Sequence, residues 1–432
     1  MLKLFRNLFE RYKSLYVPTH GWAKWIHLVK VNDIQEREGL KLANKLTKLH
    51  LEFYKQKMKV KLAAQIFSSS LAKSLEFLNK SNYEDFYDTL GTQKLLSTID
   101  RLFEIFNTKS IFNKGYKAPL SIQNYNYVMT FLNETEQFLL DIKTPDLISL
   151  TNTTRSMGCI GFLININSLR EMSREILFDY NKFQQKYILT YKISQDFLEL
   201  YFGCIREMGG NKNNPSPRQF NQSYRKLLLH SSVEPSINCN LTPQDHTDLL
   251  SIHSNLIPTC NIWMKTLVND PQLISNNDLT FFTLNISSYI AGFIIKKLVL
   301  KLTCSTCINA LANKANSKCK ENSLIEIKNN GGLYTPSDSV KRICQLVEKY
   351  LKHLVLTTLF KNINYFKSKI EIEVMKNLAK NLFEQNYQHF KETLYEVDSH
   401  FTDLIKNICR EYINIRIYSM VRTENQKFSC FL

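Results

Sequence analysis

Glycine and proline, the residues that most often interrupt regular secondary structure, are scarce: the 432 residues include 12 Gly and 10 Pro. Long leucine-rich stretches run without breakers, so we predict a mainly α-helical protein. The phosphate-binding pattern Gly-x-x-x-x-Gly-Lys-Ser/Thr is absent from the sequence, and we therefore expect no P-loop GTPase activity. The ten cysteines are scattered, which excludes a compact disulfide framework.

A signal peptide is not expected, because the N-terminal run carries charges at Lys3, Arg6 and Glu10. The longest uncharged apolar stretch, Leu279 to Ile295, contains several Thr, Asn and Ser residues, so we expect a buried helix rather than a membrane span. A hydrophobic content of 44% excludes wholesale disorder. We expect a nuclear or cytoplasmic protein without a membrane partner.

Among the charged residues, positive charge predominates. Lys and Arg outnumber Asp and Glu by 56 to 39, which gives a formal net charge of +17. This balance suits an anionic partner, and nucleic acid is the first candidate. A Lys-rich and Asn-rich composition that reflects the base bias of a genome is the alternative explanation.

Two acids, Asp196 and Glu199, lie three residues apart in an apolar run of helix length and so share a helix face. The run stops at Gly209-Gly210 and opens into a polar loop rich in Asn and Pro. Carboxylates on the buried side of a helix are costly unless they bind a metal or pair with a cation. The pattern indicates a metal site, with Glu199 facing a pocket. A solvated helix face is the alternative.

The same segment resembles a known family. Asp196-x-x-Glu199-Leu-Tyr-Phe-x-x-Ile-Arg-x-x-Gly-Gly, followed by Asn-Asn-Pro and Gln-Phe, is similar to the last catalytic segment of P element-type transposases, which include animal proteins with an N-terminal THAP zinc domain. The resemblance implies an RNase H-like fold in which two Asp and one Glu hold two Mg²⁺ ions at a phosphodiester. Glu199 takes the place of that Glu, and Asp196 is a neighbouring acid. Both are expected catalytic and metal-binding residues.

The resemblance continues at the N-terminus, where Met1-Leu-Lys-Leu-Phe-Arg-Asn7 is similar to the family segment just after the second catalytic Asp. We therefore expect the C-terminal portion of such a transposase, truncated or domesticated, without the THAP domain and the upstream catalytic Asp residues. Glu199, alone or with Asp196, is not expected to hold two Mg²⁺ ions. Strand cleavage is therefore not expected from this chain alone.

Residues from about 25 to 188 resemble the helical insertion that binds GTP in this family. Lys55 to Ser68 is similar to its Lys-Met-x-Val-Lys-Leu-Ala-x-Gln-x-Phe-Ser motif, Phe103 to Asn107 is similar to Phe-Asp-x-x-Asn, and Lys114 to Leu120 also matches. The resemblance places a guanine nucleotide at these residues: Lys45, Lys59, Val60, Ser68, Phe103, Glu104 and Asn107.

The residue types suit that ligand. Between Leu40 and Leu62, seven lysines accompany one acid, and lysines can neutralise a triphosphate as point charges. Phe103 can stack on a purine, and an acid beside it can accept hydrogen bonds from guanine N1 and N2. Here the family Asp is Glu104, one methylene longer, and a misplaced buried acceptor costs about 1–3 kcal/mol. A solvated helix face is the alternative explanation for the lysines.

Basic residues follow the acid-bearing segment, in a region that lies near DNA in the resembled family. Contacts from such residues to phosphates would be sensitive to salt and blind to sequence. Ordinary surface charge is the alternative. The expected DNA-binding residues are Arg206, Lys212, Arg218, Arg225 and Lys226.

Cys304-Ser-Thr-Cys307, with Cys319 farther along, has the spacing of half a zinc site. No second Cys-x-x-Cys or His-x-x-x-His completes it, and the remaining candidates lie far along the chain: Cys344, His353 and His400. Two cysteines that simply share a helix face are the alternative. The sequence leaves zinc undecided.

Periodicity and breakers also predict individual helices. We expect an amphipathic helix over residues 1 to about 20, helix-compatible spacing from Gln35 to Ser70, a helical stretch from Tyr83 to Asn107, and a helix from Pro217 to Leu229. One further helical stripe consists of Ile343, Leu346, Val347, Tyr350, Leu351 and Leu354.

The predicted fold class is mainly α: an incomplete RNase H-like domain interrupted by a helical GTP-binding-like insertion, plus a helical C-terminal domain. The expected boundaries are 1–24 for the first RNase H-like remnant, 25–188 for the insertion, 189–230 for the acid-bearing segment, 231–278 for a linker and 279–432 for the C-terminal domain.

The predicted function is that of a P element-type DDE transposase-like protein that binds DNA and a guanine nucleotide, with Mg²⁺ as the implied metal and self-association left open. The alternative is a helical protein–protein interaction module of transposon origin, without nucleotide or specific DNA binding.

Overall fold

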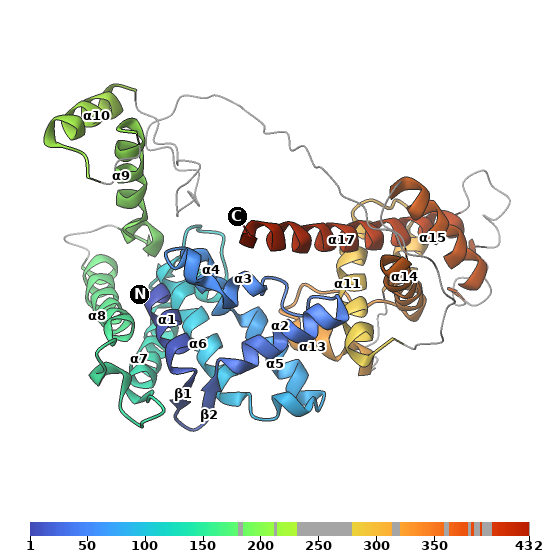
Figure 1. The fold of residues 1–432 in the computed structure, drawn as a ribbon, viewed down its shortest axis with the longest axis horizontal. Coiled ribbons are helices and arrows are strands. Elements are labelled where there is room, and N and C mark those ends of the chain that lie inside the picture. The colour runs from blue at the N-terminus through green and yellow to red at the C-terminus, as the bar shows by residue number, and fades with distance from the viewer. Residues whose placement is uncertain are drawn as a thin grey trace. The chain divides into compact units, whose positions relative to one another are not determined.

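The computed structural model describes residues 1–179, 185–210, 214–230, 279–312, 320–357, 363–378, 382–383, 389–390 and 400–431. Helices dominate this part of the chain, as Figure 1 shows, and its strands are short. The chain divides into two compact units. The first contains Met1–Asn32 and Lys45–Cys260, and the second contains Asp33–Asn44 and Asn261–Leu432. The expected linker, 231–278, lies outside the described residues.

The first unit begins with helix α1 (Leu2–Tyr12), which buries Phe5, Leu8 and Phe9 on one face. The helix ends earlier than predicted, because Lys13 adopts a left-handed conformation with φ 61°. Strands β1 (Ser14–Val17) and β2 (Gly21–Lys24) follow as an antiparallel hairpin, with Ser14 opposite Lys24. The prediction of one helix to about residue 20 was therefore wrong from residue 14 onward.

The stretch from Gln35 to Ser70 is not one helix. Helix α2 (Ile26–Glu38) ends before Gly39, whose φ of 68° suits glycine. Helix formation restarts at Thr47, whose side chain and His50 form a capping box at α3 (Lys48–Leu51). The 3₁₀ helix η1 (Phe53–Gln56) and helices α4 (Val60–Ile66) and α5 (Ser69–Lys80) complete the segment. The predicted lysine-bearing helix face is thus divided among several short elements.

Helix α6 (Leu90–Phe106) is the central helix of the first unit and buries Leu95, Ile99 and Leu102. It packs against α5 and crosses β2 closely: a Cβ added at Gly91 would lie 2.6 Å from the carbonyl oxygen of Gly21. The 3₁₀ helix η2 (Glu84–Phe86) precedes it, which breaks the helix that we predicted within 83–107.

Two longer helices, α7 (Tyr125–Asp141) and α8 (Met157–Phe178), pack on one another and enclose the core beside α1 and α6. The 3₁₀ helix η4 (Leu150–Asn152) lies between them, η3 (Gly115–Lys117) precedes α7, and η5 (Thr190–Ile193) follows α8. Strand β3 (Leu120–Ser121), just before α7, pairs with β4 (Tyr187–Ile188), after α8.

Helices α9 (Asp196–Met208) and α10 (Pro217–His230) form a hairpin of two helices. Cys204 and Ile205 of α9 pack on Leu227 of α10, with Tyr201 and Phe220 at the edge. The glycine pair ends α9 as predicted, since Gly209 is its C-cap, and the predicted second helix is present at α10.

The second unit is a bundle of helices α11 (Phe281–Val299), α14 (Asp338–Thr357), α15 (Ile363–Leu378) and α17 (His400–Phe431), joined by the shorter helices α12 (Ser305–Leu311) and α13 (Ser323–Lys328) and the 3₁₀ helix η6 (Lys320–Asn322). Ile343, Val347 and Leu351 of the predicted stripe are fully buried in its core. Helix α11 is long and apolar enough to cross a membrane. However, 61% of its apolar stretch is buried inside the protein, as in a core helix.

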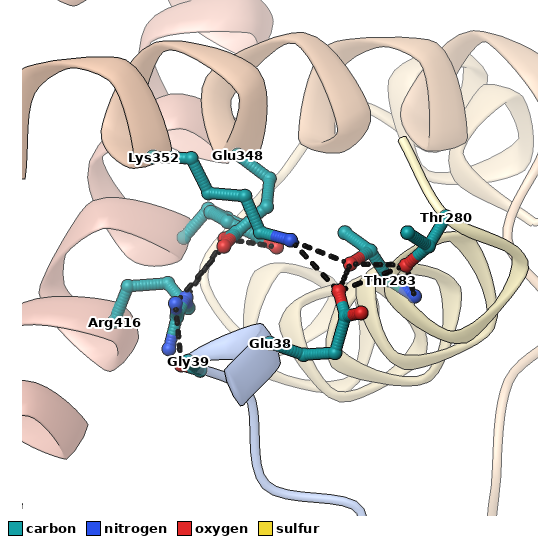
Figure 2. Close-up of polar contacts among 8 residues, drawn as sticks. Glu38, Gly39, Thr280, Thr283, Glu348, Lys352 and Arg416 are labelled. Carbon is teal, nitrogen blue, oxygen red and sulfur yellow. Dashed lines mark hydrogen bonds and ion pairs between the residues drawn. The ribbon is translucent and has the colours of Figure 1, made fainter. Parts of the chain in front are cut away.

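A buried polar network ties the segment around Glu38 to this bundle (Figure 2). Glu348 accepts hydrogen bonds from Arg416 at 2.7 and 2.9 Å and from the Tyr412 hydroxyl at 2.9 Å. Arg416 also donates to the carbonyl oxygen of Gly39 at 3.0 Å. Beside it, Lys352 donates to Glu38 at 3.2 Å, and Glu38 also accepts from Thr280 and Thr283.

Candidate functional site

The acid pair lies at the start of α9. Asp196 is its first residue and is half-buried, whereas Glu199, one turn on, is exposed. Burial raises the pKa of Asp196, and the neighbouring charge of Glu199 raises it further, whereas Lys109 and Lys3 oppose the shift. The two acids therefore interact on one helix face, as their spacing predicted.

An enclosed pocket around Glu199 is not found in the described part of the chain, where its carboxylate remains in solvent. Within the described residues, no third Asp, Glu, His or Cys converges with Asp196 and Glu199 to form a metal-ligand cluster. An exposed carboxylate keeps its hydration, so it does not need the cation that a buried one requires. The assignment of Glu199 and Asp196 as catalytic and metal-binding residues stays a prediction.

The nucleotide residues expected from the sequence meet around α6. Glu104, in the last turn of this helix, forms an ion pair with Lys117 at 2.9 Å. One turn earlier, Asp100 accepts a hydrogen bond from the backbone N–H of Ser69 at 2.8 Å. Burial, the largest cause, and the charge of Glu104 together raise the pKa of Asp100 to about 6, against the opposing effects of the Ser69 N–H, Lys117 and Lys45. Two acids and two lysines thus share one electrostatic environment.

Ser68 belongs to the same corner of the first unit. It is the N-cap of α5: its hydroxyl accepts from the N–H of Leu71 at 3.3 Å and donates to the carbonyl oxygen of Gln65 at 3.0 Å. This hydroxyl therefore already has a structural role. The backbone N–H of Ser69 is directed at Asp100, which places a carboxylate at the start of α5.

The other expected nucleotide residues are spread over two elements. Lys59 is exposed at the N-cap of α4, and Val60 is the half-buried first residue of that helix. Phe103 and Asn107 are half-buried at the C-terminal end of α6. Asp100 links this corner, because it accepts from the α5 start at Ser69 and senses the charges of Glu104 and Lys45.

A sharp bend holds Lys117 in place. Gly115 has a φ of 64°, which glycine adopts without strain. The next residue, Tyr116, stacks on Tyr127 with ring centroids 5.1 Å apart and lies against Phe131 of the same helix. The guanidinium of Arg101 lies 5.3 Å from the Tyr116 ring centroid. The bend is therefore anchored to α6 and α7, and the reach of Lys117 to Glu104 is set by packing.

Asp100 was not among the residues selected from the sequence. It precedes Glu104 by one helical turn, and this spacing in a motif that already contained Phe103 and Glu104 was a usable signal.

The expected DNA-binding residues lie on the α9–α10 hairpin. Arg218, Arg225 and Lys226 are exposed on α10, a helix without a single acid, and Arg206 is half-buried on α9. Lys212 lies outside the described residues. The described part of the hairpin therefore presents three cations to solvent on one helix, an arrangement that suits contacts to phosphates.

Comparisons with known proteins match these same segments. Residues 1–119 match the TNP-like GTP-binding insertion domain, residues 191–225 match the TNP-like RNase H C-terminal domain, and residues 278–422 match the C-terminal domain of DNA transposase THAP9. The chain is 26% identical over 442 residues to DNA transposase THAP9 of Homo sapiens. It is 24% identical over 382 residues to the Transposable element P transposase of Drosophila melanogaster.

The three family models and the two relatives support the P element-type transposase family for this chain. The two alignments cover 96% and 86% of this chain and 48% and 44% of the relatives, so it spans about half the length of the curated relatives that it matches. A solved structure, the Drosophila P element transposase strand transfer complex, is similar with a TM-score of 0.44 and 24% identity, over 53% of this chain and 50% of that one.

These findings confirm the predicted family and the predicted fold class: a mainly helical chain with a GTP-binding insertion-like domain, an RNase H-like C-terminal segment and a helical C-terminal domain. The individual site residues and the exact domain boundaries stay predictions.

Proposed function

We propose that this transposase-family chain binds a guanine nucleotide at the C-terminal half of α6 and DNA at α10. The observation that carries the nucleotide proposal is the juxtaposition of Glu104 and Asp100 with Lys117 and Lys45. One carboxylate can accept hydrogen bonds from both guanine N1 and N2, whereas adenine offers no such pair of donors. Lysines beside the acids can hold phosphates, and Phe103 offers a ring for stacking.

Mg²⁺ fits the same corner. The raised pKa of Asp100 marks a carboxylate that is costly to ionise, and a nearby cation would reduce that cost. Mg²⁺ is commonly held by one or two carboxylates together with the phosphates of a nucleotide. We therefore choose the magnesium complexes of GTP and ATP as the probes of this site.

Replacing Glu104 by Gln is expected to weaken binding of Mg·GTP about 10-fold to 100-fold, because an amide offers guanine one acceptor and one misplaced donor. Binding of Mg·ATP is expected to change little. Lys45→Glu is expected to weaken both nucleotides, since phosphate attraction does not depend on the base. Isothermal titration calorimetry of the intact chain measures all three effects.

Glu76→Gln is the matched control, because Glu76 is an acid on the neighbouring helix α5 that forms an ion pair with Lys80, away from Asp100 and Glu104. Equal affinity of the unaltered chain for GTP and ATP would contradict guanine recognition. If the chain binds any polyanion with the same affinity as GTP, the lysines are better explained as an ordinary solvated basic surface.

DNA binding is proposed for α10 because its exposed cations are unopposed by acids on that helix. Reversing Arg218, Arg225 and Lys226 to Glu is expected to reduce the slope of log Kd against log salt by about 3, since each phosphate contact contributes about 0.9. Fluorescence anisotropy with a labelled duplex over a range of salt measures this slope. Arg174→Glu on α8, an exposed residue paired with Glu171, is the control.

Strand cleavage is not proposed for this chain by itself. We expect no Mg²⁺-dependent nicking of a transposon end, because Glu199 is exposed and its partner Asp196 alone does not complete a two-metal site. Within the proposal the protein acts in the nucleus, where its DNA lies. Robust Mg²⁺-dependent nicking that is lost in Glu199→Ala would contradict the expectation that this chain alone does not cleave DNA.

One observation favours the interaction-module alternative. The α9–α10 hairpin exposes large apolar side chains: Leu198 at 58%, Phe202 at 46% and Leu228 at 62%. Such a patch commonly binds protein. Loss of a pulled-down partner in Leu228→Asp, with an unchanged DNA salt slope, would support this second function.

A further inference from the structure

Four potential metal ligands converge in the second unit. Sγ of Cys307 lies 3.5 Å from Nε2 of His389 and 3.6 Å from Nδ1 of His400. Sγ of Cys304 lies 3.6 Å from Nε2 of His389, and the two ring nitrogens are 3.2 Å apart. All four ligand atoms lie within 4.8 Å of one another. The cluster is separate from the nucleotide and acid sites, which belong to the first unit.

These spacings are those of a tetrahedral zinc centre. Bonds of about 2.3 Å to sulfur and about 2.0–2.1 Å to nitrogen place S···N pairs about 3.6 Å apart and N···N pairs about 3.3 Å apart. Without a cation, the arrangement is poor: Nε2 of His389 approaches three ligand atoms at once, although one ring nitrogen has a single proton or a single lone pair to offer.

We propose that Cys304, Cys307, His389 and His400 bind a structural zinc ion. Two thiolates and two imidazoles are a ligand set that selects zinc over the harder magnesium and calcium ions. Because four protein side chains fill a tetrahedral shell, no position is left for substrate, and the site stabilises the fold rather than performing chemistry.

The local structure prepares the cysteines for this role. Cys304 is the N-cap of α12, and Cys307 is in the first turn of that helix. The backbone N–H of Cys307 and that of Thr306 donate towards Sγ of Cys304 and lower its pKa to about 7. Burial raises the pKa of Cys307 to about 12, and metal coordination itself removes the proton from such a thiol.

Aromatic side chains enclose one flank of the cluster. Phe390 lies with its ring centroid 5.2 Å from that of His389 and 5.6 Å from that of Phe401. An apolar flank limits water and strengthens metal–ligand electrostatics. The ion would join α12 to the first residue of α17, 93 positions farther along the chain, and thereby close a long loop of the bundle.

The first experiment uses the unaltered chain, purified without chelator under reducing conditions. Inductively coupled plasma mass spectrometry is expected to find one zinc per chain. Replacement by Co²⁺ is expected to give the intense visible bands of a tetrahedral site together with a thiolate-to-cobalt charge-transfer band. A metal-free chain, a Cys304–Cys307 disulfide, or stoichiometric iron or copper would overturn the proposal.

Ligand variants locate the ion. Cys304→Ser and His389→Ala are each expected to lower zinc content severalfold and to lower the melting temperature, whereas Cys304→His, which keeps a ligand, is expected to retain cobalt with a weaker charge-transfer band. His20→Asn and Cys159→Ala, a histidine and a cysteine of the first unit, are the controls. Full zinc content in the double variant Cys304→Ser, His389→Ala would also overturn the assignment.

Discussion

Replacing Glu348 by alanine is expected to destabilise the second unit by about 3–5 kcal/mol, the usual cost of removing one partner from a buried ion pair. Glu348 is fully buried, and its two oxygens accept three hydrogen bonds, two from Arg416 and one from Tyr412 (Figure 2). Its removal leaves the Arg416 guanidinium uncompensated in the interior. Chemical denaturation followed by circular dichroism measures the loss.

The double variant Glu348→Met, Arg416→Met tests the cause. Because it removes both charges and keeps the volume, it is expected to recover most of the lost stability. Glu373→Ala on α15 is the matched control, since its pair with Lys376 is partly exposed, in contrast to the fully buried Glu348, and surface pairs contribute about 0–1 kcal/mol. A loss below 1 kcal/mol in Glu348→Ala would show that the network is not a stabilising feature.

The second large effect concerns pH and Asp100. Its pKa is raised to about 6 from an ordinary value of 3.8, mainly by burial, so the folded state holds this proton more tightly than the unfolded state. Stability contributed by the group is therefore lost as pH rises from about 4 to 6. Asp100→Asn is expected to be more stable than the unaltered chain by roughly 2–3 kcal/mol at pH 7, with the difference vanishing below about pH 4.

The asparagine keeps an oxygen that can accept from the N–H of Ser69, so the comparison isolates the charge. Thermal unfolding of both proteins from pH 4 to pH 8 gives the difference, and Asp146→Asn at an exposed position of the same unit is the control. If a magnesium nucleotide occupies this corner, saturating Mg·GTP is expected to reduce the advantage of the variant. An advantage that does not change with pH would rule out titration of Asp100 as its cause.

Local patterns predicted some helices well. The glycine pair after α9 and the proline at the start of α10 set both helix limits, because these residues act through their own backbone conformations. The hairpin at Ser14–Lys24 was missed. Lys13 ends α1 and Thr19 turns the chain between the strands, each with a positive φ that few side chains signal in advance.

The candidate site residues likewise fall into two groups, those predictable from local spacing and those that depend on tertiary packing. Asp196 and Glu199 share a face because three residues separate them on one helix, a relationship that the sequence contains. His389 could not be assigned, because it joins Cys307 across 82 positions and only the packing of the bundle brings them together. Exposure of Glu199 likewise depends on what packs beside α9, which periodicity along one helix does not encode.

The chain order of the second unit has a consequence during synthesis. Gly39 leaves the ribosome 377 positions before Arg416, the side chain that binds its carbonyl oxygen. The unit is built from Asp33–Asn44 and a distant downstream segment. The residues of Asp33–Asn44 therefore lack their packing partners until most of the chain has been synthesised. Its helices cannot complete their assembly vectorially, so nascent chains halted before residue 416 should be chaperone clients and protease substrates.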